Sequence, residues 1–444
     1  MMVADAASGP DAGTSAATRA GTPDRGFAAR HAALDVLRRV RAHDAFDAAL
    51  TAATHALSDL DRRLVHEMCA GVLRMRTELD ALLTPRITGD WRRVQEDMRD
   101  VLRLGAYQIR ELSRVPVHAA VAATVEVAKR EHGARAAGFA NAVLRRLAKE
   151  LAGAPPLPQA PTDARGLAEH YSHPGWLVGR WVTRFGFERT EALLRHNNVH
   201  SPVWLQPARW TADQLREGFH TVGISFTETA GLPGFAVHGV RVHDLPGYAD
   251  GAFVVQDPAQ ALALEHVAVP PGGLVWDACA APGGKAARLA GQNRVFACDP
   301  RRTRMPRLID TVRRAAPGVA VACGDALAAP VRTDFFDVVL LDVPCSATGT
   351  IAKHPDARWR LSARRIQRLA LLQAQLLDAT AAAVRPGGIL AYLTCSLEQE
   401  ENGAQIQAFL ERHPEFRRST EDLVLFPPDR GTDGGFAARM ERTG

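Results

Sequence analysis

The sequence describes a large and weakly basic chain with no segment long and apolar enough to span a membrane. It has 444 residues, of which 46% are hydrophobic and 23% charged, and its formal net charge is +5. This length predicts two or three domains, and no apolar run approaches the ~18 residues of a membrane helix. The six cysteines form no Cys-x-x-Cys pair and no zinc-like cluster with histidine. We therefore expect no metal site, no structural disulfide and a cytoplasmic location.

The N-terminal part of the chain predicts a disordered tail followed by an all-α domain. Residues 1–26 are small and polar, which is typical of disorder. Residues 27–153 repeat apolar side chains at helical spacing, and Ser58 is a candidate helix cap. The expected helices span residues 29–41, 62–82, 97–112 and 118–132. This stretch carries 21 basic and 16 acidic residues, a bias compatible with a polyanionic partner.

A proline-rich linker at residues 154–165 predicts a domain boundary. Residues 166–250 then mix helical and strand-like patterns, which predicts a small α+β subdomain of RRM-like type. Its expected helices span residues 175–185 and 188–197, and its expected strands span residues 203–206, 224–227, 236–242 and 251–256.

Residues 251–444 alternate strands with helices, which predicts a doubly wound, Rossmann-like parallel sheet. The expected parallel strands span residues 274–278, 294–298, 319–323, 338–341 and 389–393. The clearest helices are expected at residues 362–384 and 399–413. Two further strands, at residues 423–426 and 435–440, are expected to be antiparallel edge strands.

Polar side chains follow three successive strands of this predicted sheet. The first strand runs into Asp277-Ala278-Cys279-Ala280-Ala281-Pro282-Gly283-Gly284-Lys285, where two glycines allow a ligand close to the backbone. The second strand ends in Asp299 and the third is followed by Asp325. Carboxylates at the carboxyl edge of a sheet bind ribose hydroxyls in many α/β proteins. Together they suit S-adenosylmethionine, which has a ribose, an adenine and a free amino-acid end.

Two cysteines follow two further buried strands. Asp342-Val343-Pro344-Cys345-Ser346 ends one strand and Thr394-Cys395-Ser396 ends another. If these strands are neighbours, both thiols and Asp342 lie at one edge. A thiolate that adds to C6 of cytosine makes C5 nucleophilic enough to accept a methyl group, and a carboxyl group near N3 can stabilise the developing charge. A second thiol could assist release of the product. The residues alone do not show which of the two cysteines, Cys395 or Cys345, attacks the base.

These motifs, with Glu400-Glu401-Asn402, resemble those of the RNA cytosine-5 methyltransferases. Phe139-Ala140-Asn141-Ala142-Val143-Leu144-Arg145-Arg146-Leu147 resembles the NusB-like extension of the bacterial small-subunit ribosomal RNA enzymes of the Sun/RsmB type. The resemblance implies that Cys395 is the nucleophile, that Cys345 assists release and that Asp342 contacts the cytosine. It places Lys285 at the cofactor or at the reacting centre. The implied cofactor-binding residues are Ala278, Cys279, Ala280, Ala281, Pro282, Gly283, Gly284, Lys285, Asp299, Arg304, Asp325 and Asp342.

The predicted protein is a monomeric S-adenosylmethionine-dependent enzyme that acts on small-subunit ribosomal RNA. Cytosine-5 methyltransferases for tRNA or large-subunit RNA are close alternatives, because only the helical domain argues for the small subunit. A non-catalytic RNA-binding factor of the NusB type is a further alternative, but it would not need two cysteines at matching strand ends. An amino-group methyltransferase is disfavoured, since no Asn/Asp-Pro-Pro-aromatic motif follows a strand.

Overall fold

The computed structural model describes residues 23–153, 160–328 and 331–444, which form two compact units. One unit comprises residues up to 39, 47–72 and 79–156, and the other comprises residues 40–46, 73–78 and 157–444. Most of the predicted tail (1–22) and half of the predicted linker (154–159) lie outside the described residues. The described remainder differs from prediction at two points, because residues 23–26 and 164–165 are helical.

The described part of the first unit is built mainly from the helices α1 (Pro23–Arg41), α2 (Phe46–Thr54), α3 (Asp59–Leu83), α4 (Glu96–Glu111), α5 (Val117–His132) and α6 (Ala134–Leu151). Short 3₁₀ turns follow α3 at Thr84–Arg86 and Trp91–Arg93. The predicted Ser58 cap is present, since its side chain accepts a hydrogen bond from the Asp61 N–H. Helices α4 and α6 approach closely at Gly105, where a Cβ would lie 2.6 Å from Leu144 Cδ1.

The second unit starts with α7 (Ala164–His170), α8 (Gly175–Phe185) and α9 (Phe187–Asn197) and continues into a small sheet. Strands β1 (Val203–Pro207), β2 (Phe226–Thr227), β3 (Phe235–Val237) and β4 (Phe253–Val255) pair antiparallel in the order β2-β3-β1-β4. Helix α10 (Ala212–Thr221) joins β1 to β2. The strand predicted at 236–242 ends already at Val237, and a 3₁₀ turn follows at Val242–Asp244.

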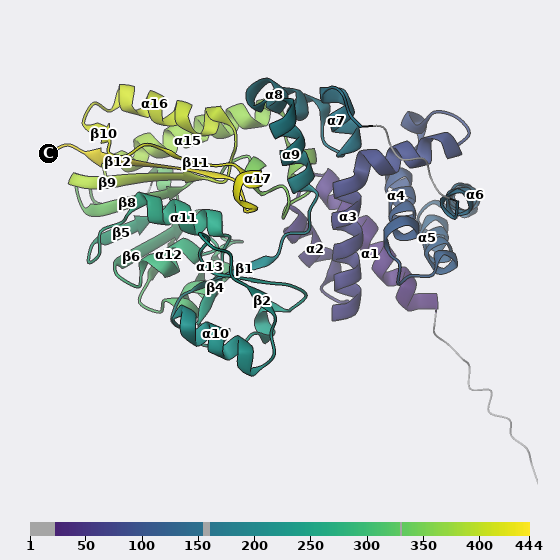
Figure 1. Cartoon of the computed structure of the whole chain (residues 1–444), viewed down its shortest axis with the longest axis horizontal. Helices are drawn as coiled ribbons and strands as arrows, with labels where there is room; N and C mark the ends of the chain where they lie inside the picture. Colours follow the sequence, from purple (N-terminus) through teal and green to yellow (C-terminus); the bar gives the residue numbers. More distant parts are fainter. Residues whose placement is uncertain (1–22, 154–159, 329–330) are drawn as a thin grey trace, which may run out of the picture. The chain divides into compact units, whose positions relative to one another are not determined.

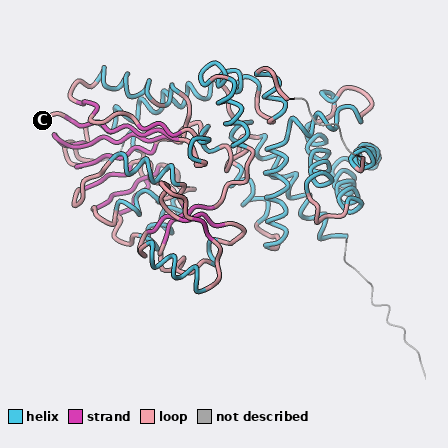
Figure 2. Tube along the Cα trace, in the orientation of Figure 1, coloured by secondary structure: helices cyan, strands magenta, loops and turns pink. Residues whose placement is uncertain are grey.

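A larger mixed sheet follows, with the strand order β10-β12-β9-β8-β5-β6-β7, and β11 pairs with β12 (Figures 1 and 2). Strands β5 (Leu274–Asp277), β6 (Arg294–Asp299), β7 (Ala320–Cys323), β8 (Phe336–Asp342) and β9 (Val384–Thr394) are parallel, as predicted. Strands β10 (Phe416–Arg418), β11 (Leu423–Leu425) and β12 (Gly435–Arg442) are antiparallel additions. The predicted edge position of β12 is wrong, since β12 pairs with β9 on one side and with β10 and β11 on the other.

Helices cover both faces of this sheet (Figure 1). Helices α11 (Pro258–Val267), α12 (Gly284–Leu289) and α13 (Met305–Ala315) pack on one face, and α15 (Ala363–Ala381) and α16 (Gly403–Arg412) pack on the other. Each face of the sheet has its own hydrophobic core, and successive residues of β5 point to opposite faces. Val275 lies in the core under α11–α13 and Trp276 in the core under α15 and α16. Burial on both faces explains why the parallel strands read as continuous apolar runs. The remaining short elements are α14 (Ala357–Arg360), α17 (Pro427–Arg430) and the 3₁₀ turns Ala326–Ala328, Thr348–Thr350 and Gln399–Glu401.

Candidate active site

The carboxyl ends of the parallel strands gather acidic residues, including the predicted Asp299 and Asp342. Asp277, Asp299 and Asp342 are the last residues of β5, β6 and β8. Cys279 lies among them: burial raises the pKa of its thiol, and the charges of Asp277, Asp342, Asp299 and Asp325 raise it further. This edge of the sheet therefore concentrates negative charge around a thiol that stays protonated.

The segment from Ala278 to Lys285 turns sharply between β5 and α12. Gly283 has φ +104°, a left-handed conformation that glycine adopts without a steric penalty. A Cβ on Gly283 would lie 3.0 Å from Leu308 Cδ1 and 3.2 Å from Thr311 Cβ, so α13 leaves little room for a side chain. The predicted glycine pair thus permits a close approach of the loop to α13.

Asp277 is buried, and neither carboxylate oxygen accepts a well-formed hydrogen bond among the described residues, although the backbone N–H of Cys279 lies near it and favours the ionised form. Burial and the neighbouring Asp342 charge raise its pKa from 3.8 to about 7, although Lys285 opposes the shift. An unsatisfied buried carboxylate is costly in a folded protein, so such a group in a native structure points to a missing partner. The sequence prediction omitted Asp277 from the site, even though it ends a strand just as Asp299 does.

Lys285 and Asp342 form an ion pair at this edge. Lys285 Nζ lies 2.6 Å from Asp342 Oδ2 and also donates a hydrogen bond to Gln260 Oε1 on α11. Only 9% of the Lys285 side chain is exposed, compared with 30% of the Asp342 side chain. The lysine is therefore held in a buried position, while the carboxylate of Asp342 remains partly accessible to solvent. Gln260 was not predicted, and no local pattern marks it.

Cys345 and Cys395 lie side by side, as the sequence predicted for neighbouring strands. Strands β8 and β9 pair in register, with Asp342 opposite Leu393, and the two sulfur atoms are 3.1 Å apart. The hydrogen bond to Cys395, burial and the nearby Glu401 charge raise the pKa of the Cys345 thiol. Either sulfur can donate the hydrogen bond that joins the two cysteines.

Asp299, Asp325 and Arg304 complete the set of predicted site residues. Asp299 is buried and accepts a hydrogen bond from the Arg301 N–H at 2.9 Å, while the exposed Asp325 accepts one from the Leu327 N–H at 3.0 Å. Arg304 is exposed at the start of α13. Among the described residues, its side chain forms no hydrogen bond or ion pair with the other predicted site residues.

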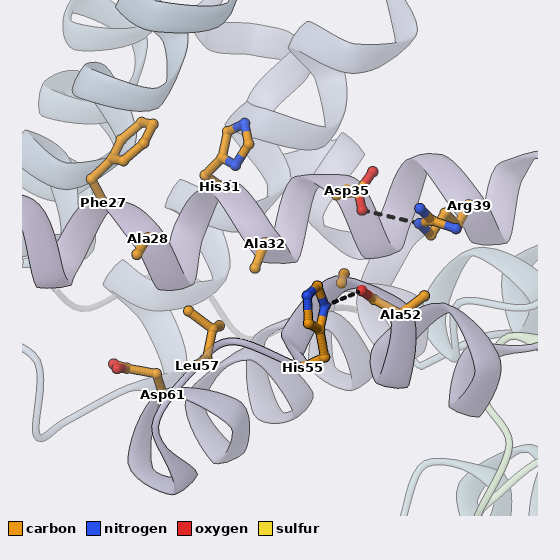
Figure 3. Close-up of a pocket in the computed structure, with 11 residues that line it drawn as sticks. Phe27, Ala28, His31, Ala32, Asp35, Arg39, Ala52, His55, Leu57 and Asp61 are labelled. Carbon is orange, nitrogen blue, oxygen red and sulfur yellow. Dashed lines mark hydrogen bonds and ion pairs between the residues drawn. The ribbon is translucent and has the colours of Figure 1, made fainter.

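A separate surface groove of about 750 Å³ lies between α1 and the α2–α3 segment of the first unit (Figure 3). His31, Asp35, His55 and Asp61 are among its lining residues, and it contains none of the predicted site residues. Over the described ranges, no three His, Cys, Asp or Glu side chains are arranged to hold a metal ion. In the same part of the chain, no helix combines the length and apolarity needed to cross a membrane.

A Rossmann-like sheet with acidic strand ends and a glycine-containing first loop is typical of α/β domains that bind nucleotide cofactors. Comparison with known proteins identifies this one as a methyltransferase domain. Residues 265–440 match the 16S rRNA methyltransferase RsmB/F family, residues 173–237 match the ferredoxin-like domain of RsmF/B-like methyltransferases and residues 28–149 match the NusB family.

Similarity to whole proteins over most of the chain supports the same family. The chain is 35% identical to ribosomal RNA small subunit methyltransferase B of Vibrio cholerae over 411 residues, which cover 89% of the chain and 92% of that protein. It is 36% identical to the enzyme of the same name from Salmonella arizonae, over 81% of the chain and 84% of that protein. The crystal structure of PH0851 shares the fold, with a TM-score of 0.78, 24% identity and coverage of 95% of this chain and 99% of that one. The chain belongs to the RsmB/F family of methyltransferases.

Proposed function

We propose that the protein transfers a methyl group from S-adenosylmethionine to C5 of a cytosine in small-subunit ribosomal RNA, through a covalent cysteine adduct. The observation that carries this proposal is the pair of thiols 3.1 Å apart at the ends of β8 and β9, beside the Asp342–Lys285 pair. A methyltransferase that acts on an already nucleophilic atom has no use for two adjacent thiols, whereas C5 of cytosine requires prior attack at C6.

The residues at the strand ends fit S-adenosylmethionine. The Asp277 carboxylate has no well-formed hydrogen bond among the described residues, so it offers an acceptor for a polar or cationic group. The loop from Ala278 to Lys285 has a glycine where a side chain would collide with α13. Asp299 and Asp325 would bind the ribose and the adenine side of the cofactor. The bound cofactor supplies the methyl group.

The two cysteines have separate roles in this proposal. Cys395 attacks C6 as the thiolate, and the electron pair displaced toward C5 makes that carbon the nucleophile for methylation. Cys345 keeps its proton because its pKa is raised, and it donates a hydrogen bond to the attacking sulfur. Once the methyl group is in place, a water molecule takes the proton from C5, the C5–C6 double bond re-forms and the C6–S bond breaks, so that Cys395 leaves as a thiolate. The Cys345 thiol stabilises the departing sulfur as a hydrogen-bond donor.

The Asp342–Lys285 pair would orient and neutralise the base. The partly exposed Asp342 carboxylate can accept a hydrogen bond from the 4-amino group of cytosine, which distinguishes cytosine from uracil. The Lys285 ammonium beside it can stabilise the negative charge that develops at N3 when the thiolate adds to C6. A fixed cation and acceptor within 2.6 Å of each other are thus preorganised for this step.

The base must leave its stack to reach both thiols. The helical stretch 27–153, with its excess of basic residues, would hold the RNA through phosphate contacts, which makes binding salt-sensitive. The small four-stranded sheet of residues 203–255 offers a second RNA-binding surface.

The test combines methyl transfer with adduct trapping. Wild type, Cys395→Ala and Cys345→Ala are incubated with methyl-labelled cofactor and small-subunit ribosomal RNA, and Cys323→Ala serves as a control that removes an exposed thiol at the end of β7. We expect Cys345→Ala to accumulate a denaturation-resistant protein–RNA adduct and Cys395→Ala to form neither adduct nor product. The reverse pattern would exchange the two roles. Transfer only to tRNA or large-subunit RNA would refute the choice of RNA, and no transfer to any RNA would refute the proposed activity.

A further inference from the structure

Each cysteine of the pair is followed by a serine, and both serines contact one buried carboxylate. Ser346 and Ser396 each donate a hydroxyl hydrogen bond to Glu401 Oε2, the second at 2.5 Å. The Ser346 N–H donates a further hydrogen bond to Glu401 Oε1 at 2.9 Å, and the two serine oxygens are 3.0 Å apart. Glu401 therefore joins the segments that carry Cys345 and Cys395.

The carboxylate is itself held from two other elements. Gln373 on α15 donates to Glu401 Oε1 at 3.0 Å and also to the carbonyl of Pro344 at 2.9 Å, directly before Cys345. The Tyr392 hydroxyl on β9 donates to the Glu401 carbonyl at 2.7 Å. Glu401 and Gln373 are both fully buried. The sheet and the helix packed on it thus fix the position of Glu401. Through its hydrogen bonds to Ser346 and Ser396, Glu401 in turn holds the segments that contain Cys345 and Cys395.

Glu401 forms no ion pair with a Lys, Arg or His side chain among the described residues. Burial raises its pKa, while the hydrogen bonds from Ser346, Ser396 and Gln373 favour the ionised form. A neutral side chain such as glutamine could hydrogen-bond to the same two segments without the cost of burying a charge, so the charge of Glu401 calls for a separate explanation. The charge lies close enough to Cys345 to oppose its ionisation.

We propose that Glu401 is a positioning residue that fixes the separation of the two thiols through the serine beside each of them, and that its buried charge opposes ionisation of Cys345. The role in catalysis rests on the function proposed above, but the protonation of the pair is a property of the free protein.

The first test uses the full-length free protein without RNA. The pH dependence of alkylation of Cys345 and Cys395 by iodoacetamide is followed by mass spectrometry in wild type and Glu401→Gln. Removal of the charge should move the Cys345 midpoint to lower pH, and each pKa unit raises the thiolate fraction about tenfold at a given pH below the midpoint. Glu400→Gln is the matched control: it makes the same chemical change on the same 3₁₀ turn, at a residue that is ion-paired with Arg180.

An unchanged Cys345 midpoint in Glu401→Gln would overturn the proposal, as would an equal shift in the Glu400→Gln control. If Glu401→Gln does not fold, Ser346→Ala with Ser396→Ala tests the positioning role and leaves the carboxylate in place. We expect the double variant to form the Cys345–Cys395 disulfide with diamide about tenfold more slowly, since an error of about 1 Å between reacting groups is costly. A wild-type rate would refute the positioning role.

A second readout separates positioning from general support of the fold. Glu401→Gln should lower methyl transfer and change the fraction of trapped adduct, while the affinity for S-adenosylhomocysteine stays within about twofold of wild type. A parallel loss of cofactor affinity, adduct and thermal stability would show that Glu401 only supports the fold. If wild type methylates no RNA, the proposed function fails, but the alkylation result still decides the role of Glu401.

Discussion

Replacement of Asp277 by asparagine should make the stability of the protein less sensitive to alkaline pH while weakening cofactor binding. The pKa of about 7 for the buried carboxyl group compares with 3.8 for an exposed one. Because the folded-state pKa is the higher one, the group favours folding fully below pH 3.8, and this contribution is lost as pH rises through 7. At 1.36 kcal/mol per pKa unit, ionised Asp277 costs about 4 kcal/mol above pH 7.

The asparagine variant has no such titration. At pH 5 the wild-type cost is only about 2 kcal/mol, because the buried group is still protonated there. The stability of Asp277→Asn relative to wild type should therefore improve by about 2–3 kcal/mol between pH 5 and pH 8.5. Urea unfolding at a series of pH values measures this change, and calorimetric titration with S-adenosylhomocysteine measures the loss of affinity.

Asp337→Asn is the matched control for this experiment. Asp337 accepts hydrogen bonds from the Leu274 N–H and from Arg385, and these partners lower its pKa. Both its folded and unfolded pKa values lie below 5, so the control should be destabilised by an amount that is constant from pH 5 to 8.5. A pH-independent difference between wild type and Asp277→Asn would refute the reasoning about the buried carboxyl group.

Three other substitutions test separate parts of the structure. Gly283→Ala should destabilise the protein by about 1–3 kcal/mol and weaken cofactor binding, because φ is +104° and the new Cβ would lie 3.0 Å from Leu308, and thermal unfolding with cofactor titration measures both effects. Lys285→Met should lower single-turnover methyl transfer about 10²-fold, since it leaves Asp342 without its ammonium partner; a wild-type rate would exclude Lys285 from the reacting centre. Arg103→Met should lower the free energy of unfolding by about 3–5 kcal/mol, because two aspartates would keep their charges without the buried guanidinium, and a loss below about 1 kcal/mol would show that water compensates them.

Much of the site could be predicted because its residues follow the ends of strands. The end of a strand can be recognised from the few residues around it, as can the helical repeat of apolar side chains. The apolar run before Asp342 identifies β8, and the equivalent run before Thr394 places Cys395 beside Cys345 if the strands are neighbours. The sheet confirms that pairing. The serine–glutamate hydrogen bonds depend instead on how the turn after β9 packs under the sheet, and no sequence spacing shows that. Local patterns led to a wrong edge position for β12, because its place between β9 and the β10 and β11 strands is decided by long-range pairing.

The interior position of β12 has a consequence for synthesis of the protein. One edge of β9, the strand directly before Cys395, pairs with β12, which begins about 40 residues later in the chain. A nascent chain that has produced β5–β9 therefore exposes the open backbone of an apolar strand until residues 435–442 emerge. The strand that ends beside Cys395 is thus among the last parts of the sheet to be completed, and a chain truncated before β12 would be prone to edge-to-edge aggregation.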